Sequence, residues 1–162
     1  MQWIPDFSYD NAPTANMIVA PGGRGAHDIH ARHKDGTIDY IKMVANAPGN
    51  KYIMSVCTGA FLLGAAGLLD GRHCQVSSHN YSKFEREVPK AKLIKDPSLN
   101  FVQDGNLFTS NGPRSGLATA LRAVEVHCGT GYKNNLRELI EYIVPPGKGS
   151  LVENGNITNI AV

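Results

Sequence analysis

At 162 residues the chain is long enough for one domain with one substantial hydrophobic core. Its 42% apolar and 19% charged residues are those of an ordinary globule, and no apolar run approaches the roughly 20 residues needed to span a bilayer. The net charge of +2 comes from scattered basic residues, which gives no argument for nucleic acid or a membrane surface as a partner.

The first half of the chain predicts alternating strands and helices. Two short, uninterrupted apolar runs are typical of parallel strands buried on both faces. Each is followed by a segment with helical spacing of apolar residues, the first only after the turn Pro21-Gly22-Gly23. In chain order we predict a strand over 17–20, a helix over 38–45, a strand over 52–56 and a helix over 58–66. Such alternation predicts parallel pairing with right-handed crossovers.

The second half continues the pattern with one hairpin. We predict a third strand over 74–78, a short helix over 81–87, a hairpin around Asp104-Gly105, a helix over 115–128 and a last helix over about 133–143, before Pro145-Pro146. The elements together predict an α/β fold, a flavodoxin-like three-layer sandwich with a mainly parallel sheet. They assign one domain to residues 1–147, whereas residues 148–162 have little to pack and are predicted to be an extended tail.

The segment Ser55-Val-Cys-Thr-Gly-Ala-Phe-Leu-Leu63 carries the strongest chemical signal. An apolar strand ends at Cys57 and a helix begins at once, with Gly59 allowing close packing at the reversal. This arrangement is typical of a nucleophile elbow, which exposes the reactive atom at the edge of the sheet. The positive end of the helix dipole and the unpaired N–H groups there favour thiolate over thiol. We therefore predict that Cys57 is a reactive nucleophile.

Two further features are predicted at the same sheet edge, because ligands of open α/β sheets bind at the carboxyl ends of strands. Gly22 and Gly23 end the neighbouring strand, and their N–H groups could form an oxyanion hole with the N–H of Thr58. His79 follows the third predicted strand and is a candidate for acid–base catalysis. Arg24 follows the glycines and is a candidate for binding an anionic substrate, although a solvated surface position is the simpler interpretation.

Five motifs in this order resemble the ThiJ/PfpI superfamily, and the similarity runs from about Pro13 to Pro146. The motifs are Ala20–Gly23, Ser55–Leu63, Ala66–Arg72, Ser77–His79 and Asp104–Gly112. The Ser-Val-Cys-Thr-Gly string and the segment Glu141–Pro146 are most similar to the isonitrile hydratase branch. The resemblance implies Cys57 as nucleophile, N–H groups of Gly23 and Thr58 at the bound carbon, no metal or organic cofactor, a small-molecule substrate and a homodimer.

The sequence departs from the family pattern at two places. Peptidase-like members have a histidine directly after the nucleophile, and Thr58 in that position counts against proteolysis. Members also carry an acidic residue, from an earlier strand and helix, that contacts the cysteine. No acidic residue before Pro21 stands in a matching motif, since only Asp6 and Asp10 occur there. His79 and the Thr58 hydroxyl are then the candidate proton donors within the chain.

The remaining cysteines and histidines have simpler interpretations. Cys74 and Cys128 are predicted to be core residues, since free cysteines are often small buried hydrophobes. His27, His30 and His33 stand three apart, but the segment is polar and looks like a loop, so we predict no metal site. The cysteines form no disulfide framework, and the N-terminus has no signal-peptide pattern. A reducing, cytoplasmic compartment is the expectation.

The leading functional hypothesis is a cofactor-independent cysteine lyase or hydrolase acting on a small electrophile. Hydration of an isonitrile to an N-substituted formamide is the best match, through attack of the Cys57 thiolate on the terminal carbon. Glyoxalase-type action on an α-oxoaldehyde is the nearest chemical alternative. A third hypothesis is not enzymatic: Cys57 would be an oxidation sensor in a stress response, cycling through sulfenic or sulfinic acid.

Overall fold

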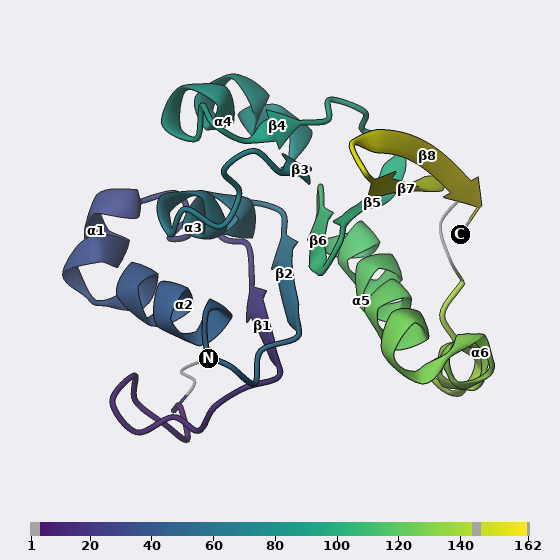
Figure 1. The fold of residues 1–162 in the computed structure, drawn as a ribbon, viewed down its shortest axis with the longest axis horizontal. Coiled ribbons are helices and arrows are strands. Elements are labelled where there is room, and N and C mark those ends of the chain that lie inside the picture. The colour runs from purple at the N-terminus through teal and green to yellow at the C-terminus, as the bar shows by residue number, and fades with distance from the viewer. Residues whose placement is uncertain (1–3, 144–146, 162) are drawn as a thin grey trace.

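The computed structural model describes residues 4–143 and 147–161, and a six-stranded sheet forms its centre (Figure 1). In spatial order its strands are β1 (Met17–Ala20), β2 (Tyr52–Val56), β6 (Leu107–Ser110), β5 (Leu99–Asp104), β7 (Lys148–Glu153) and β8 (Asn156–Ala161). Three of the five pairings are parallel, whereas β5–β6 and β7–β8 are antiparallel. The predicted mainly parallel sheet is therefore confirmed.

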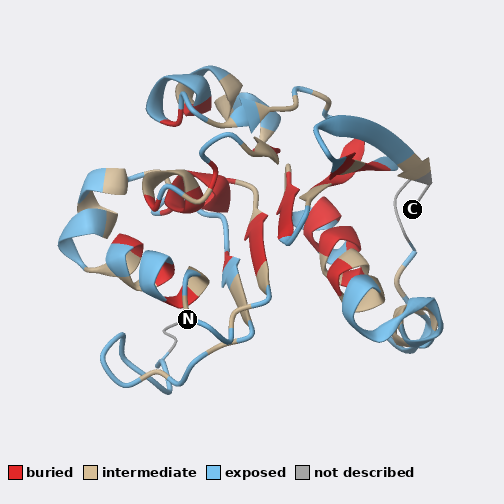
Figure 2. Cartoon of the chain, viewed as in Figure 1, coloured by how far each residue is buried: buried red, intermediate tan, exposed pale blue. Residues whose placement is uncertain are grey.

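Helices cover both faces of the sheet. The helices are α1 (Ile29–Lys34), α2 (Thr37–Ala45), α3 (Gly59–Ala65), α4 (Tyr81–Glu87), α5 (Pro113–Cys128) and α6 (Thr130–Leu139). Strand β2 shows how the layers form: Ile53 packs with α2 and α3, and the next residue, Met54, packs on the opposite face with α5. Figure 2 shows the buried residues concentrated where these layers meet. The three-layer α/β sandwich is confirmed.

The predicted third strand is wrong as a member of this sheet. Only β3 (His73–Cys74) is extended there, and it pairs with β4 (Lys92–Leu93) in a separate two-stranded sheet. The backbone N–H of Gln75 then donates to the Thr109 hydroxyl at 2.8 Å, and the side-chain amide of Gln75 donates to the carbonyl of Asp96 at 2.6 Å. These bonds hold the segment against β6 through a side chain, and it bends into a short 3₁₀ helix over Ser78–Asn80.

The expectation that residues 148–162 have little to pack is also wrong. Strand β7 pairs with β5 in parallel and β8 closes the sheet beside it. Small residues make this possible, since a side chain at Gly149 would collide with the ring of Phe101. Ser150 and Val152 are buried in the same strand.

Smaller differences concern helix ends. The last helix spans Thr130–Leu139 and closes at Glu141, whose φ is +52°, while the proline pair at 145 and 146 lies outside the described residues. The polar segment interpreted as a loop contains α1, which Asp28 caps by accepting from the N–H of Ala31 at 3.1 Å. None of the described helices is long and apolar enough to cross a membrane.

Candidate active site

Cys57 occupies the junction between β2 and α3 in a backbone conformation that L-residues rarely adopt. Its φ is +57°, and its N–H donates to the carbonyl of Ser110 at 2.9 Å, which anchors the turn to the neighbouring strand β6. Holding a non-glycine residue there costs about 1–3 kcal/mol, a strain that concentrates at functional sites. The side chain is half-buried. The predicted nucleophile elbow is therefore present, with Cys57 at its tip.

Two glycines allow the end of β1 to lie directly against this elbow. A Cβ on Gly22 would stand 2.7 Å from the Cβ of Cys57 and 3.2 Å from the nitrogen of Thr58. A Cβ on Gly59 would collide with the carbonyl group of Ala20. The backbone of the Gly22 turn therefore forms one wall beside the Cys57 side chain.

Thr58 ties the two turns together. Its buried hydroxyl donates to the carbonyl oxygen of Gly23 and accepts from the N–H of Gly23, both at 2.9 Å. The structure thus corrects two expectations, because in this conformation neither the Gly23 N–H nor the Thr58 hydroxyl proton is free for a ligand. The N–H groups of Gly22 and Thr58 make no hydrogen bond among the described residues, and they are the donors beside Cys57.

His79 and Arg24 are both exposed. His79 lies in the 3₁₀ helix rather than at a strand end, and within the described ranges no hydrogen bond joins its ring to Cys57 or Thr58. Arg24 follows Gly23 and makes no ion pair with any described residue. Neither side chain is held in place, so both roles stay predictions. The two early acids, Asp6 and Asp10, are exposed as well.

The other cysteines differ from each other. Cys74 is a core residue as predicted, and burial, with a smaller contribution from Asp104, raises its pKa to about 12. Cys128 is exposed, so its prediction as core is wrong: it is the last residue of α5, where Gly129 turns the chain into α6. No group of three or more His, Cys, Asp or Glu side chains within residues 4–143 and 147–161 could hold a metal ion.

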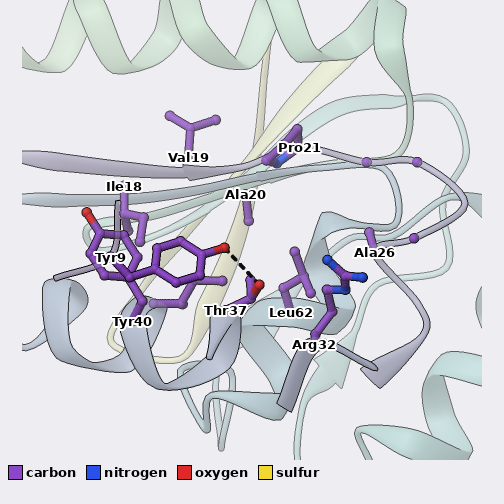
Figure 3. Close-up of a pocket in the computed structure, with 14 residues that line it drawn as sticks. Tyr9, Ile18, Val19, Ala20, Pro21, Ala26, Arg32, Thr37, Tyr40 and Leu62 are labelled. Carbon is purple, nitrogen blue, oxygen red and sulfur yellow. Dashed lines mark hydrogen bonds between the residues drawn. The ribbon is translucent and has the colours of Figure 1, made fainter. Parts of the chain in front are cut away.

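A cavity of about 430 Å³ lies on the α2 side of β1 and reaches Gly22 and Gly23 (Figure 3). Its aromatic wall is a stacked pair, Tyr9 and Tyr40, with ring centroids 4.7 Å apart. The Tyr9 hydroxyl is 2.9 Å from that of Thr37. Sequence reasoning did not find these residues, because Tyr9 and Tyr40 share no motif and only the fold brings them together.

Comparison with known proteins gives a consistent result. A model of the DJ-1/PfpI family matches residues 1–126. Isonitrile hydratase of Pseudomonas putida is 30% identical over 148 residues, which are 90% of this chain and 60% of that protein. The HTH-type transcriptional regulator GbdR of Pseudomonas aeruginosa is 27% identical over 142 residues, 88% of this chain and 36% of the regulator.

Among solved structures, a THiJ/PfpI family protein from Pseudomonas syringae superposes with a TM-score of 0.67 at 26% identity. The match covers 85% of this chain and 54% of that one. The chain therefore spans less than two thirds of the length of each of these relatives.

Proposed function

Because this chain belongs to the DJ-1/PfpI family, we propose that Cys57 is the nucleophile of a cysteine enzyme that acts on a small electrophile. The leading reaction is the hydration of an isonitrile to an N-substituted formamide. The similarity to isonitrile hydratase supports this choice. The observation that carries it is the strained Cys57 backbone, with φ +57°, held against Gly22.

The reaction needs no redox partner. The thiol sulfur bonds to the terminal isonitrile carbon, and that carbon takes up a proton, which gives a thioimidate on Cys57. Water then adds to the same carbon, one of its protons goes to nitrogen, and the C–S bond breaks. The formamide leaves and the thiol regains its proton, so the net change is the addition of one water.

The elbow supplies electrostatic stabilisation in this scheme. When the tetrahedral adduct collapses, the oxygen that came from water loses its proton and carries negative charge as the C–S bond breaks. In this scheme the N–H groups of Gly22 and Thr58 donate to that oxygen, a role supported by their closeness to Cys57 and by the lack of another hydrogen bond to them among the described residues. His79, exposed in the 3₁₀ helix, is the proton donor that the scheme proposes within the chain.

The test is formamide production from a simple alkyl isonitrile by the wild-type chain and by two cysteine variants. Cys57→Ala is expected to abolish turnover, because the variant lacks the attacking sulfur. Cys128→Ser is the matched control, since it removes an exposed thiol that is remote from the elbow in sequence. Full turnover by Cys57→Ala would sink the proposal, as would the absence of turnover by wild type on isonitriles.

The similarity to the regulator GbdR favours a second candidate, in which the domain senses rather than catalyses. In that case peroxide would oxidise the Cys57 thiolate to a sulfenate and be reduced to water. Intact mass after mild peroxide treatment separates the candidates. One added oxygen on Cys57, together with no turnover of isonitriles or of methylglyoxal, an α-oxoaldehyde, would favour the sensor.

A further inference from the structure

The sequence contains two Asn-Gly pairs, Asn111-Gly112 and Asn154-Gly155, and the fold holds them in different ways. An asparagine side chain can react with the backbone nitrogen of the residue that follows it, which makes asparagine one of the thermolabile residues of proteins. Glycine in the following position leaves that nitrogen unshielded, because it has no Cβ. Whether such a pair reacts in a folded chain then depends on how firmly its carboxamide and the glycine N–H are held.

Asn154-Gly155 is the two-residue loop of the β7–β8 hairpin. The two strands pair as far as Glu153 and Asn156, and φ angles of +50° at Asn154 and +80° at Gly155 are those of a type I′ turn. Asn154 is exposed, and its carboxamide makes no hydrogen bond with any residue in the described ranges. A Cβ on Gly155 would meet nothing within 4 Å, so the backbone of the turn lies in open space.

The hairpin around this turn is held by few buried contacts. Residues 153–159 are all exposed, and the side chain of Ile157 is 50% exposed. One hydrogen bond between side chains joins the two strands, from the Ser150 hydroxyl to Asn159 at 2.8 Å. Segments with few buried apolar contacts and solvent-exposed backbone hydrogen bonds open at a low free energy. The turn can therefore open and bring the Gly155 nitrogen to the Asn154 side chain.

Asn111-Gly112 is held on both sides of the same reaction. The Asn111 Nδ2 donates to the carbonyl oxygens of Pro97 at 3.0 Å and of Leu99 at 3.4 Å, and its Oδ1 lies 2.9 Å from the Ser115 hydroxyl. The N–H of Gly112 donates to the same hydroxyl at 3.0 Å. Attack of the Gly112 nitrogen on the carboxamide has to break these hydrogen bonds in a half-buried site, which costs free energy.

We propose that Asn154 is a self-modification site of this chain, where deamidation produces an isoaspartate that opens the β7–β8 hairpin. The Gly155 nitrogen bonds to Cγ of Asn154 and the Cγ–Nδ2 bond breaks, so that ammonia leaves with the proton from the Gly155 nitrogen. The product is a five-membered cyclic imide. Water then adds to one of the two imide carbonyl carbons and breaks its bond to nitrogen, which gives aspartate or isoaspartate. Water is the one co-reactant.

The two products have different consequences for the hairpin. Aspartate followed by glycine forms the same type I′ turn, so the strand pairing is retained. In isoaspartate the main chain runs through the former side chain, which lengthens the loop by one methylene. A two-residue loop fixes the register of its strands, and Val152 pairs with Ile157 only in that register. Because β8 buries little apolar surface, we expect its pairing with β7 to be lost rather than shifted.

The test follows both Asn-Gly pairs while the full chain is aged in mildly alkaline buffer. Mass spectrometry of proteolytic peptides measures deamidation, and chromatography separates the aspartyl from the isoaspartyl peptides. We expect conversion at Asn154 to be at least about tenfold faster than at Asn111, because only Asn111 has to break side-chain hydrogen bonds. Ser115→Ala removes the hydroxyl that holds Asn111 and Gly112, so it should accelerate conversion at Asn111 and leave the rate at Asn154 unchanged.

Hydrogen exchange tests the effect on the hairpin. The aged chain should lose protection of the β8 amides in proportion to its isoaspartyl content, whereas Asn154→Asp, with the charge but an ordinary main chain, should keep it. Asn154→Gly, which supports the positive φ and cannot deamidate there, is the control for ageing elsewhere. Equal rates at Asn154 and Asn111, or no acceleration at Asn111 in Ser115→Ala, would overturn the assignment. Full β8 protection in isoaspartyl chains would overturn the opening of the hairpin.

Discussion

The Thr58 hydroxyl makes two hydrogen bonds with a single residue, Gly23: it donates to the carbonyl oxygen and accepts from the N–H. Thr58 directly follows Cys57, and Gly23 lies just beyond β1, so this contact joins the elbow to the end of the neighbouring strand. The hydroxyl proton is occupied by the contact. We therefore interpret Thr58 as a positioning residue rather than as a proton donor.

Thr58→Val tests this interpretation, because valine keeps the shape and removes both hydrogen bonds. At about 1 kcal/mol for each bond, the free energy of unfolding should fall by about 2 kcal/mol. The alkylation rate of Cys57 by iodoacetamide should also change, since the Gly22 wall is no longer held. Thr58→Ser, which retains the hydroxyl, is the control. Equal stability and equal alkylation rates in wild type and Thr58→Val would contradict the positioning role.

Gly22→Ala is expected to displace the nucleophile while leaving the domain folded. The new methyl group would stand 2.7 Å from the Cβ of Cys57 and 2.9 Å from the carbonyl oxygen of Val56, so the elbow must shift. A displacement of about 1 Å costs about 100-fold in kcat/KM for formamide production. Gly49→Ala is the control, because a Cβ there meets nothing within 4 Å. Similar kcat/KM values for the two variants would show that the contact does not position Cys57.

The strain at Cys57 predicts a conflict between stability and activity. Glycine adopts a φ of +57° without penalty, whereas alanine does not. Cys57→Gly should therefore be more stable than Cys57→Ala by about 1 kcal/mol in urea unfolding, and both should lack turnover. The opposite order is expected for a helix interior, where Ala120→Gly in α5 should cost about 1 kcal/mol. If Cys57→Gly is the less stable of the two elbow variants, the turn is not strained.

Elements with a local signal could be predicted from the sequence. The uninterrupted runs of β1 and β2, the hairpin of β5 and β6 and the apolar helix after Cys57 each contain their own signal, and the structure confirms them. The turn of the hairpin differs by one residue from the predicted Asp104-Gly105, because Asp104 pairs with Leu107 and the loop is Gly105-Asn106. The elbow followed from the order strand, cysteine, glycine, helix. The family resemblance rested on the same short motifs, and the DJ-1/PfpI match confirms it.

The predictions that were wrong concerned segments whose structure depends on contacts between residues far apart in the sequence. The backbone N–H of Gln75 donates to the Thr109 hydroxyl and its side-chain amide donates to the carbonyl of Asp96, instead of Gln75 pairing in the main sheet. No local sequence pattern predicts these two contacts. Strand β7 depends on the fit of Gly149 to the ring of Phe101. The hydrogen bond between Gly23 and Thr58 joins residues 35 positions apart. It leaves the N–H of Gly22, rather than that of Gly23, as the candidate oxyanion donor at the end of β1.

Cys74 should be the unreactive cysteine of the three. It is fully buried, and burial, followed by the effect of Asp104, raises its pKa to about 12. At pH 8 iodoacetamide should alkylate Cys57 and Cys128 in the folded chain, and Cys74 only after unfolding, as mass spectrometry of tryptic peptides would reveal.

The raised pKa of Cys74 also makes the stability of the fold depend on pH. The neutral thiol is fully compatible with folding below the unfolded value, about 8.5, and stability is lost as the pH rises from there toward about 12. The stability difference between wild type and Cys74→Ala should therefore shrink between pH 8 and about pH 10.5, and a constant difference would mean that the thiol ionises as easily in the folded chain as in the unfolded one.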